Sequence, residues 1–287
     1  AQTCPVHEII VWDDGSTDGT REAVAGLSGT SAPVRYFHGP NAGKSRALNQ
    51  AMAEISGTHV WICDDDDLIL PDACARLMQE LEDHPELDYC AGLHEDFTVD
   101  QASGEIIRKA PGYSKASQPD QVFSDALDGC HIFQPGLIVR RAYYDKVGPF
   151  DETLNRSQAY QMLLRLTRHG AGRVLPHVVF LHREHQGTRG SAGERFSMKD
   201  ANRKWIKYHR QIIKPLLDDL GDVRRVGSRI KADEHADGVG LTGHAPMVID
   251  AQTATRFVVA ATSGDTVRLY HLEADAPGVS VLPLEVM

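Results

Sequence analysis

Four aspartates in a row, residues 64–67, directly follow a short apolar run at residues 60–63. Unpaired carboxylates repel one another and are costly to bury without a counter-charge. The apolar run is typical of a strand buried on both faces, so the acids are expected at its C-terminal end. Residues 68–70 are expected to turn the chain, and Pro71 suits the first turn of a helix. This stretch therefore predicts a strand, an acidic loop and a helix.

The acidic loop has two interpretations. In open α/β sheets, ligands bind outside the carboxyl ends of the strands, and a carboxylate cluster there suits a hard cation such as Mg²⁺ or Mn²⁺. Phosphate oxygens of a substrate would complete its coordination. The alternative is an acidic helix cap stabilised by the helix dipole. One or two acids are enough for a cap, so four favour the cation.

Apolar patterns along the chain predict the order of the elements. In the first 95 residues we expect strands at 7–12, 34–38, 60–63 and 87–93, and helices at 20–27, 44–55 and 71–84. This alternation implies an α/β fold with a doubly wound, mostly parallel sheet. Further on we expect a hairpin between Phe97 and Ile107, strands at 133–140 and 174–181, and helices at 121–127, 141–147 and 155–169.

The C-terminal part of the chain is expected to differ from the rest. Residues 194–220 predict a basic helix that packs its apolar side on the domain or touches an anionic membrane or a lipid-linked acceptor. A charged linker is expected at 221–247, and β-rich runs follow at 256–261, 266–272 and 279–286. We therefore divide the chain into a main domain (1–190), a C-terminal helix (191–220) and a linker with a small β tail (221–287).

Composition excludes some classes of protein. The formal net charge of −10 argues against nucleic acid as a general partner. We expect no transmembrane segment and no signal peptide, and a cytoplasmic location that could be peripheral to the inner membrane face. The five cysteines form no C-x-x-C pair, so a reducing compartment and no zinc site are expected. Cys63 and Cys90 are expected in the core.

Two further polar segments follow predicted strands. Asp13 and Asp14 lie in a turn where they could accept hydrogen bonds from a nucleobase or ribose, or could simply stabilise the turn and the following helix. Lys44 and Arg46 begin the next helix after Gly43. Cations oppose the dipole at a helix N-terminus, so an anion is expected nearby. A nucleotide diphosphate or the acid run would serve.

Four short motifs now resemble a known family. Residues 11–20 read VWDDGSTDGT, residues 41–49 read NAGKSRALN, residues 63–68 read CDDDDL, and residues 147–152 read VGPFDE. In this order they resemble the family 2 glycosyltransferases, which have a GT-A fold. The resemblance covers roughly residues 1 to 190. Each motif is weak alone, and their order makes the resemblance specific.

The resemblance implies a nucleotide-sugar donor, usually a UDP-sugar, and a divalent metal, Mn²⁺ or Mg²⁺. Asp14 would contact the base, Asp64 would lie near the ribose, and Asp66 would bind the metal. The segment from Arg183 to His185 matches one that approaches the donor phosphates. The expected donor-binding residues are Asp13, Asp14, Gly43, Lys44, Arg46, Asp64, Asp65 and Arg183, and the expected metal ligands are Asp66 and His185.

The chain departs from the family pattern in two places. Such domains usually begin with an apolar strand and a helix that this sequence does not show, so two strand edges are expected to lie free unless another segment, such as 279–284, fills the slot. In addition, inverting members carry a carboxylate base where Ala159 stands. An engineered change, a natural inactive member, or a base supplied by Asp151 or Glu152 would explain this. An engineered change is favoured because the other motifs are intact.

The sequence thus predicts an inverting, metal-assisted glycosyltransferase with a nucleotide-sugar donor. The acceptor would be a glycan, a lipid-linked sugar or a small molecule, bound near His131, Gln134 and Glu152. One alternative is a catalytically inactive module that binds nucleotide sugar. Another is a nucleotidyltransferase, which shares the sheet type but should carry a glycine-rich phosphate loop.

Overall fold

The computed structural model describes residues 2–184 except 31 and 101, residue 212, and four strands between 231 and 273. The chain divides into two compact units. The first combines Ala1–Ala126 with Cys130–Lys199, and the second combines Leu127–Gly129 with Asp200–Met287. The site described below lies in the first unit.

Apart from β4, the first unit has the order of strands and helices expected from the sequence. Its strands are β1 (Ile9–Asp13), β2 (Val34–His38), β3 (His59–Trp61), β4 (Leu68–Ile69), β5 (Tyr89–Val99), β6 (Ile106–Pro111), β7 (Leu137–Arg140) and β8 (Gly172–Arg183). Its helices are α1 (Thr20–Ala25), α2 (Lys44–Glu54), α3 (Ala73–Asp83), α4 (Val122–Asp128), α5 (Arg141–Val147) and α6 (Gln158–His169), with a short 3₁₀ turn at Gln134–Gly136. The α/β class is confirmed.

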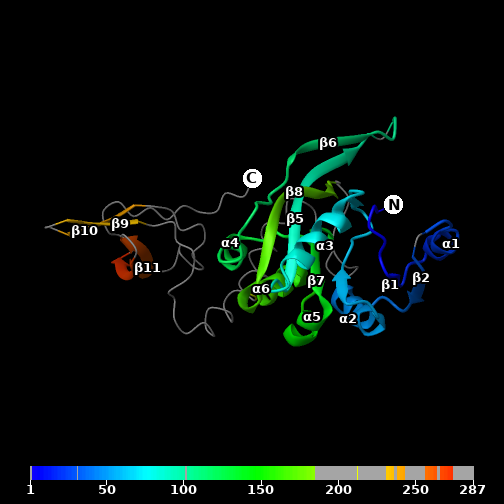
Figure 1. Cartoon of the computed structure of the whole chain (residues 1–287), viewed down its shortest axis with the longest axis horizontal. Helices are drawn as coiled ribbons and strands as arrows, with labels where there is room; N and C mark the ends of the chain where they lie inside the picture. The colour runs from blue at the N-terminus through cyan, green and yellow to red at the C-terminus, as the bar shows by residue number, and fades with distance from the viewer. Residues whose placement is uncertain are drawn as a thin grey trace. The chain divides into compact units, whose positions relative to one another are not determined.

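The strands of this unit form two sheets (Figure 1). β1 and β2 pair in parallel. The larger sheet has the order β3-β7-β5-β8-β4, and β6 pairs with β5. Its long central ladder, β5 with β8, is parallel, whereas β3, β4, β6 and β7 join antiparallel. The parallel ladders agree with a GT-A-like sheet, and the expected hairpin is present as β5–β6.

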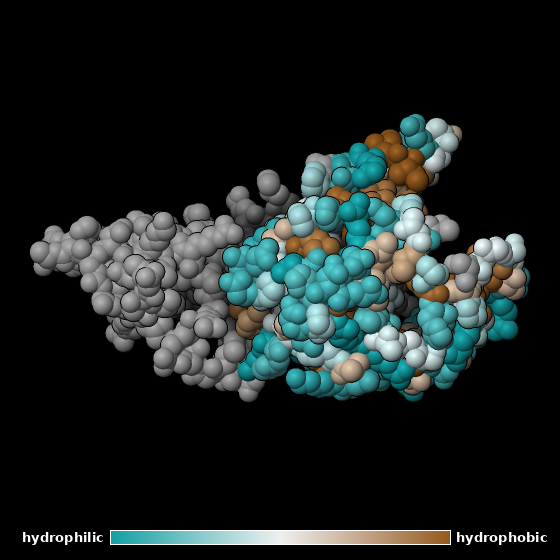
Figure 2. All heavy atoms as spheres, in the orientation of Figure 1, coloured by the Kyte–Doolittle hydropathy of each residue, from teal (hydrophilic) through white to brown (hydrophobic). Residues whose placement is uncertain are grey.

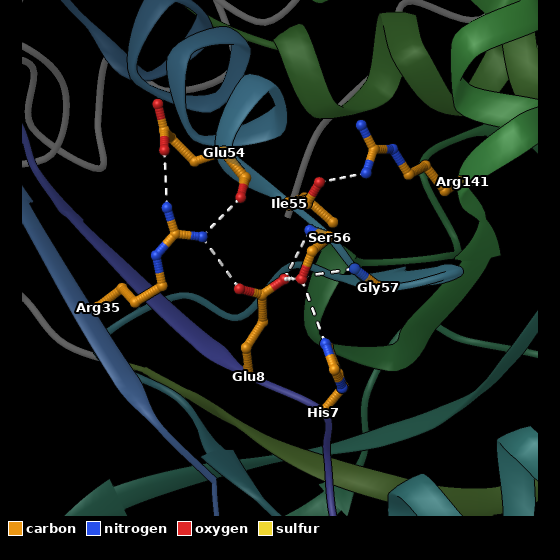
Figure 3. A network of polar contacts seen from close by, with 8 residues as sticks. All are labelled: His7, Glu8, Arg35, Glu54, Ile55, Ser56, Gly57 and Arg141. Carbon is orange, nitrogen blue, oxygen red and sulfur yellow. Dashed lines mark hydrogen bonds and ion pairs between the residues drawn. The ribbon is translucent and has the colours of Figure 1, made fainter.

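Within the described residues, β1 pairs only with β2, and β3 pairs only with β7. Side chains connect the two sheets instead (Figure 3). The Glu8 carboxylate accepts hydrogen bonds from the Ser56 amide at 2.6 Å, the Ser56 hydroxyl at 2.7 Å and the Gly57 amide at 3.3 Å. Arg35 binds Glu8 at 3.1 Å and Glu54 at 2.7 Å. Residues 279–284, the segment suggested for the slot, lie outside the described residues.

The core of the larger sheet is built on α3. Ala73, Leu77 and Leu81 are spaced four residues apart, so they lie on one face of the helix, and all three are buried. They pack against residues of the neighbouring strands, among them Cys90 and Phe180. This packing holds α3 over the sheet and fixes the acid run that precedes the helix.

Two details of the sequence prediction were wrong. Cys63 is exposed, whereas Cys90 is buried as expected, because the strand β3 ends at Trp61 and the chain then leaves the core. Residues 68–70 were expected to form a turn, but Leu68 and Ile69 form β4 and pair with Leu181 and Phe180 of β8. β4 forms because its two residues pair with the edge of β8. A sequence pattern of two residues is too short to predict a strand.

The β5–β6 hairpin stands out from the sheet and carries apolar side chains (Figures 1 and 2). Ile106 and Ile107 are consecutive residues of β6, and both are about half exposed, at 48% and 47%. Neighbouring strand residues point to opposite faces, so both faces of β6 are open to solvent at this point.

The second unit contains a four-stranded sheet of order β10-β9-β11-β12. β11 (Arg256–Ser263) and β12 (Thr266–Glu273) confirm two of the expected β-rich runs. β9 (Lys231–His235) and β10 (Gly238–Thr242) lie in the segment expected to be a linker. The two strands pair antiparallel from His235 and Gly238, a hairpin that the charge of the segment concealed. The expected helix at 191–220 lies outside the described residues, apart from residue 212.

None of the helices that the structure describes combines the length and the apolar character needed to span a bilayer.

The Glu8 network predicts a dependence of stability on pH. The Ser56 backbone amide, followed by the Ser56 hydroxyl, lowers the pKa of Glu8 from 4.5 to about 2. A pKa that is lower in the folded protein stabilises it above the unfolded pKa, and this contribution is lost as pH falls from about 4.5 towards 2. We expect Glu8→Gln to flatten the fall in unfolding free energy across this range, measured by urea denaturation.

The exposed residue Glu22 on α1 provides the matched control, and Glu22→Gln should leave the pH profile unchanged. A Glu8→Gln profile that falls as steeply as that of the unchanged chain would contradict the role given to this carboxylate.

Candidate functional site

The loop after β1 is held by its own aspartates. Asp13 is 5% exposed, and its carboxylate accepts hydrogen bonds from the Tyr36 hydroxyl and from the Ser16 amide, the latter at 2.7 Å. The hydrogen bond from Tyr36 keeps the pKa of Asp13 well below its usual range, against the opposing effect of burial. His38 lies 3.3 Å from the same carboxylate. Asp13 is therefore an anion that fixes the loop carrying Asp14.

Asp14 joins this loop to the start of α2. Its two carboxylate oxygens accept hydrogen bonds from the backbone amides of Ala42 and Gly43, both at 2.8 Å. Gly43 has φ of 92°, in the left-handed region where a side chain would be strained. Asp14 is therefore an anion at the start of α2, where it accepts hydrogen bonds from the two amides that precede the helix.

Lys44 extends the contact to the acid run. The Lys44 ammonium forms an ion pair with Asp64, and both side chains are about one-third exposed. The loops of the first, second and third sequence motifs therefore meet at one place, as expected if they share a ligand. Arg46 is exposed and makes no ion pair within the described part of the chain.

Arg183 holds the far end of the acid run. Its backbone amide donates to Asp67 at 2.9 Å, its Nε donates to the Asp66 carbonyl at 2.7 Å, and its guanidinium lies over the ring of Phe97. Burial raises the pKa of Asp67, and the neighbouring carboxylates of Asp66 and Asp64 raise it further. Asp65 is exposed. The run thus places four consecutive carboxylates at one loop, where Lys44 and Arg183 are among the basic residues that contact it.

The fourth motif is fastened to α2 by Asn49. The Asn49 amide donates to the Phe150 carbonyl at 3.0 Å and to the Glu152 carboxylate at 2.9 Å, and its oxygen accepts from the Phe150 amide at 2.8 Å. Glu152 is exposed. One helix therefore carries Lys44 against the acid run and Asn49 against the loop that precedes α6.

Ala159 lies in the first turn of α6, as expected for the position of the base. The helix begins after Ser157, which has φ of 60°. Asp151 accepts hydrogen bonds from the Thr153 amide at 2.8 Å and its hydroxyl at 2.6 Å. Asp151 therefore stabilises its own turn, whereas Glu152 presents a carboxylate to solvent.

Among the residues expected near the acceptor, His131 and Gln134 are buried, at 1% and 7% exposure. The Gln134 side-chain oxygen has no hydrogen-bond partner among the described residues. His185, the expected second metal ligand, lies outside the described residues, so its role stays a prediction.

The sequence prediction missed a group of three potential metal ligands on β5 and β8, which we call the β5–β8 cluster: His94, Asp96 and His182. His94 and Asp96 are two residues apart on β5 and so share one face of the strand. That spacing was visible in the sequence, but His182 comes beside Asp96 only through the β5–β8 pairing.

Comparison with known proteins agrees with this geometry. The family model described as Glycosyl transferase family 2 matches residues 1–148, which is more than half of the chain. The chain belongs to glycosyltransferase family 2. The match favours this family of enzymes over the nucleotidyltransferase alternative.

Among similar curated proteins, an uncharacterized glycosyltransferase of Rickettsia bellii is 28% identical over 182 residues, covering 58% of this chain and 24% of its own length. The chondroitin synthase of Pasteurella multocida is 28% identical over 169 residues, covering 59% and 17%. GalNAc(5)-diNAcBac-PP-undecaprenol beta-1,3-glucosyltransferase of Campylobacter jejuni is 40% identical over 79 residues, covering 25% and 24%. This chain thus spans about a quarter or less of each relative.

Among solved structures, S. aureus TarS 1–349 in complex with UDP-GlcNAc aligns with a TM-score of 0.50 at 19% identity. The alignment covers 65% of this chain and 52% of that chain. At this identity the likeness concerns the fold, and it agrees with the expected GT-A architecture.

The Asn49 contacts predict a stability effect. Asn49→Ala removes three hydrogen bonds that hold residues 150–152, so we expect it to lower the unfolding free energy by about 1–3 kcal/mol. The exposed residue Gln50 on the same helix gives the control, since Gln50→Ala should change it by less than about 0.5 kcal/mol. Both effects are measured by urea denaturation. Equal effects of the two substitutions would contradict the proposed role of Asn49 in holding residues 150–152.

Proposed function

We propose that this chain transfers a sugar from a UDP-sugar to an acceptor hydroxyl with inversion, assisted by a divalent metal. The observation that carries the proposal is the Lys44–Asp64 ion pair, because it joins the acid run to the α2 loop that Asp14 already holds. Three loops that carry acids, amides and a cation therefore converge. The UDP-GlcNAc complex of TarS, which has a similar fold, supports this choice of donor.

We propose separate roles in donor binding for the residues of the site. Asp14 is proposed to contact the base, with Asp13 fixing the loop, and Asp64 and Asp65 to lie at the ribose side. Lys44, Arg46 and Arg183 supply positive charge for the diphosphate, and the glycine at position 43 lets backbone amides approach it.

The acid run fits a hard cation. Asp66 and Asp67 add like charges beside Asp64, and the raised pKa of Asp67 reflects this crowding as well as burial. Carboxylate oxygens are the ligands that Mg²⁺ and Mn²⁺ prefer. Asp66 would hold the ion, with His185 as a proposed second ligand. When bound, such an ion neutralises charge that develops on a leaving diphosphate.

The acceptor hydroxyl must lose a proton as it attacks the anomeric carbon. Ala159 cannot accept a proton, although it occupies the turn where a base is expected. Glu152 is the better placed substitute of the two candidates, because it is exposed and held by Asn49, whereas Asp151 stabilises its own turn. If Glu152 does not act as base, the chain is a module that binds nucleotide sugar without transferring it. Ala159 is the observation that favours this second candidate.

The acceptor is proposed to be a glycan, a lipid-linked sugar or a small molecule. A lipid-linked acceptor is consistent with the undecaprenol named for the Campylobacter jejuni relative, and would place this chain at the cytoplasmic side of a membrane. The buried Gln134 and His131, together with Glu152, are the proposed acceptor side of the site.

Donor binding can be measured by isothermal titration calorimetry with UDP and UDP-sugars. We expect binding that is at least tenfold tighter with Mn²⁺ present, and we expect Asp66→Ala to abolish this gain because the metal loses its carboxylate ligand. Asp83→Ala, which removes an exposed acid at the opposite end of α3, is the control and should bind like the unchanged chain. Binding that ignores both Mn²⁺ and Asp66→Ala would contradict the assignment of the metal.

Restoring a carboxylate at position 159 separates the enzyme from the binding module. A general base contributes about 10²–10⁴-fold to rate, so Ala159→Asp should raise sugar transfer or UDP-sugar hydrolysis by that factor in an enzyme. An acid in the first turn of α6 also suits the helix dipole, so the fold should tolerate it. The control is Ala159→Asn, which has nearly the same shape and no basic oxygen.

No gain over Ala159→Asn with any donor that binds would support the inactive module. The contribution of Glu152 is measured separately, since Glu152→Gln should remove residual activity of the unchanged chain if this residue acts as base.

A further inference from the structure

The β5–β8 cluster lies outside the acids assigned to the donor. Asp96 is paired in register with His182, so their side chains leave neighbouring strands side by side. The Asp96 carboxylate oxygen lies 2.9 Å from His182 Nδ1 and 3.8 Å from His94 Nε2. One ligand atom from each of the three residues lies within 4.8 Å of the others. Ligand atoms that share one tetrahedral ion at bonds of about 2.0–2.2 Å lie about 3.3–3.6 Å apart, so the separations of 2.9 Å and 3.8 Å lie on either side of this spacing and small side-chain shifts would reach it.

The His94 ring is built into the core beside this cluster. His94 is 2% exposed, and its ring packs edge-on against Phe133 at 4.6 Å and beside Phe180 at 5.3 Å between centroids. Gly112 makes room for it, since a Cβ there would come within 1.9 Å of Nε2. The position of this imidazole is therefore fixed by packing.

A buried imidazole needs a polar partner, because burying an unpaired polar group is costly. The Asp96 carboxylate, 3.8 Å from Nε2, is too far away for a direct hydrogen bond to this ring nitrogen. A cation between His94, Asp96 and His182 would bind the ring and the carboxylate together.

We propose that the β5–β8 cluster binds one Zn²⁺ ion per chain through His94, Asp96 and His182. Two imidazoles and one carboxylate are a typical ligand set for zinc, whereas Mg²⁺ prefers oxygen ligands alone. Three protein ligands leave a fourth position for water or a substrate oxygen. The apolar rings of Phe133 and Phe180 form a shell that limits solvent access to His94.

This site neighbours the acid run but shares no residue with it. His182 is followed by Arg183, whose amide binds Asp67, so the two regions are adjacent along β8. The proposal that this cluster binds zinc does not depend on the proposed donor or reaction. The sequence expectation of no zinc site rested on the spacing of the cysteines, which says nothing of histidine and carboxylate ligands.

The test is metal binding by the whole chain, purified without a histidine tag and stripped with chelator. Co²⁺ is titrated and followed by its visible absorption, and Zn²⁺ is then added as competitor. With excess Mg²⁺ present to occupy the oxygen ligands of the acid run, we expect one Co²⁺ per chain, displaced by Zn²⁺. Asp96→Asn and His182→Gln should each weaken binding at least tenfold. His177→Gln is the matched control, because His177 is an exposed histidine of the same strand, and it should bind within about twofold of the unchanged chain.

Asp66→Ala, which removes a carboxylate of the acid run, should leave unchanged the Co²⁺ that binds in the presence of excess Mg²⁺. Circular dichroism of each metal-free variant checks that it folds. If Asp96→Asn does not fold, the partly exposed His182 still provides the test. The proposal is overturned if the chain takes up no Co²⁺, if His182→Gln binds as tightly as the unchanged chain, or if Asp66→Ala loses binding as fully as the cluster variants.

Discussion

The geometry of the site depends on the carboxylate of Asp14 and the two amides that it receives from the start of α2. These bonds fix α2 against the loop after β1. Because Lys44 is the first residue of α2, the same bonds also decide where its ammonium lies, and it lies at Asp64. The Asp14 contact therefore brings the first acidic loop to the helix whose Lys44 reaches the acid run.

The helix α2 also positions residues on the other side of the site. Asn49 is five residues beyond Lys44 and binds the backbone at Phe150 and the carboxylate of Glu152. The positions proposed for donor and acceptor are thus set by opposite parts of one helix. Since β1 and β3 are not paired with each other in the described residues, side-chain contacts such as these, together with those of Glu8, link the two sheets.

Much of this arrangement could be predicted from the sequence. Periodicity gave the order of strands and helices, and the acids after β1 and β3 fell at strand ends, where ligands bind. What local patterns could not provide was pairing between distant segments. The antiparallel entry of β7 between β3 and β5, the short β4 and the meeting of Asp96 with His182 all depend on strand register, which is set by the packing of the whole sheet. Cys63 was misplaced because its strand ends two residues earlier than its apolar run suggests.

We propose above all that the loops of Asp14, Lys44 and Asp66 hold a nucleotide diphosphate with its metal. The most direct measurement is a crystal structure of this chain with UDP and Mn²⁺, using the anomalous signal to place the metal. The account predicts the uracil beside Asp14 and a manganese peak at Asp66. UDP bound away from these loops, or a manganese peak with no carboxylate of the acid run among its ligands, would contradict it.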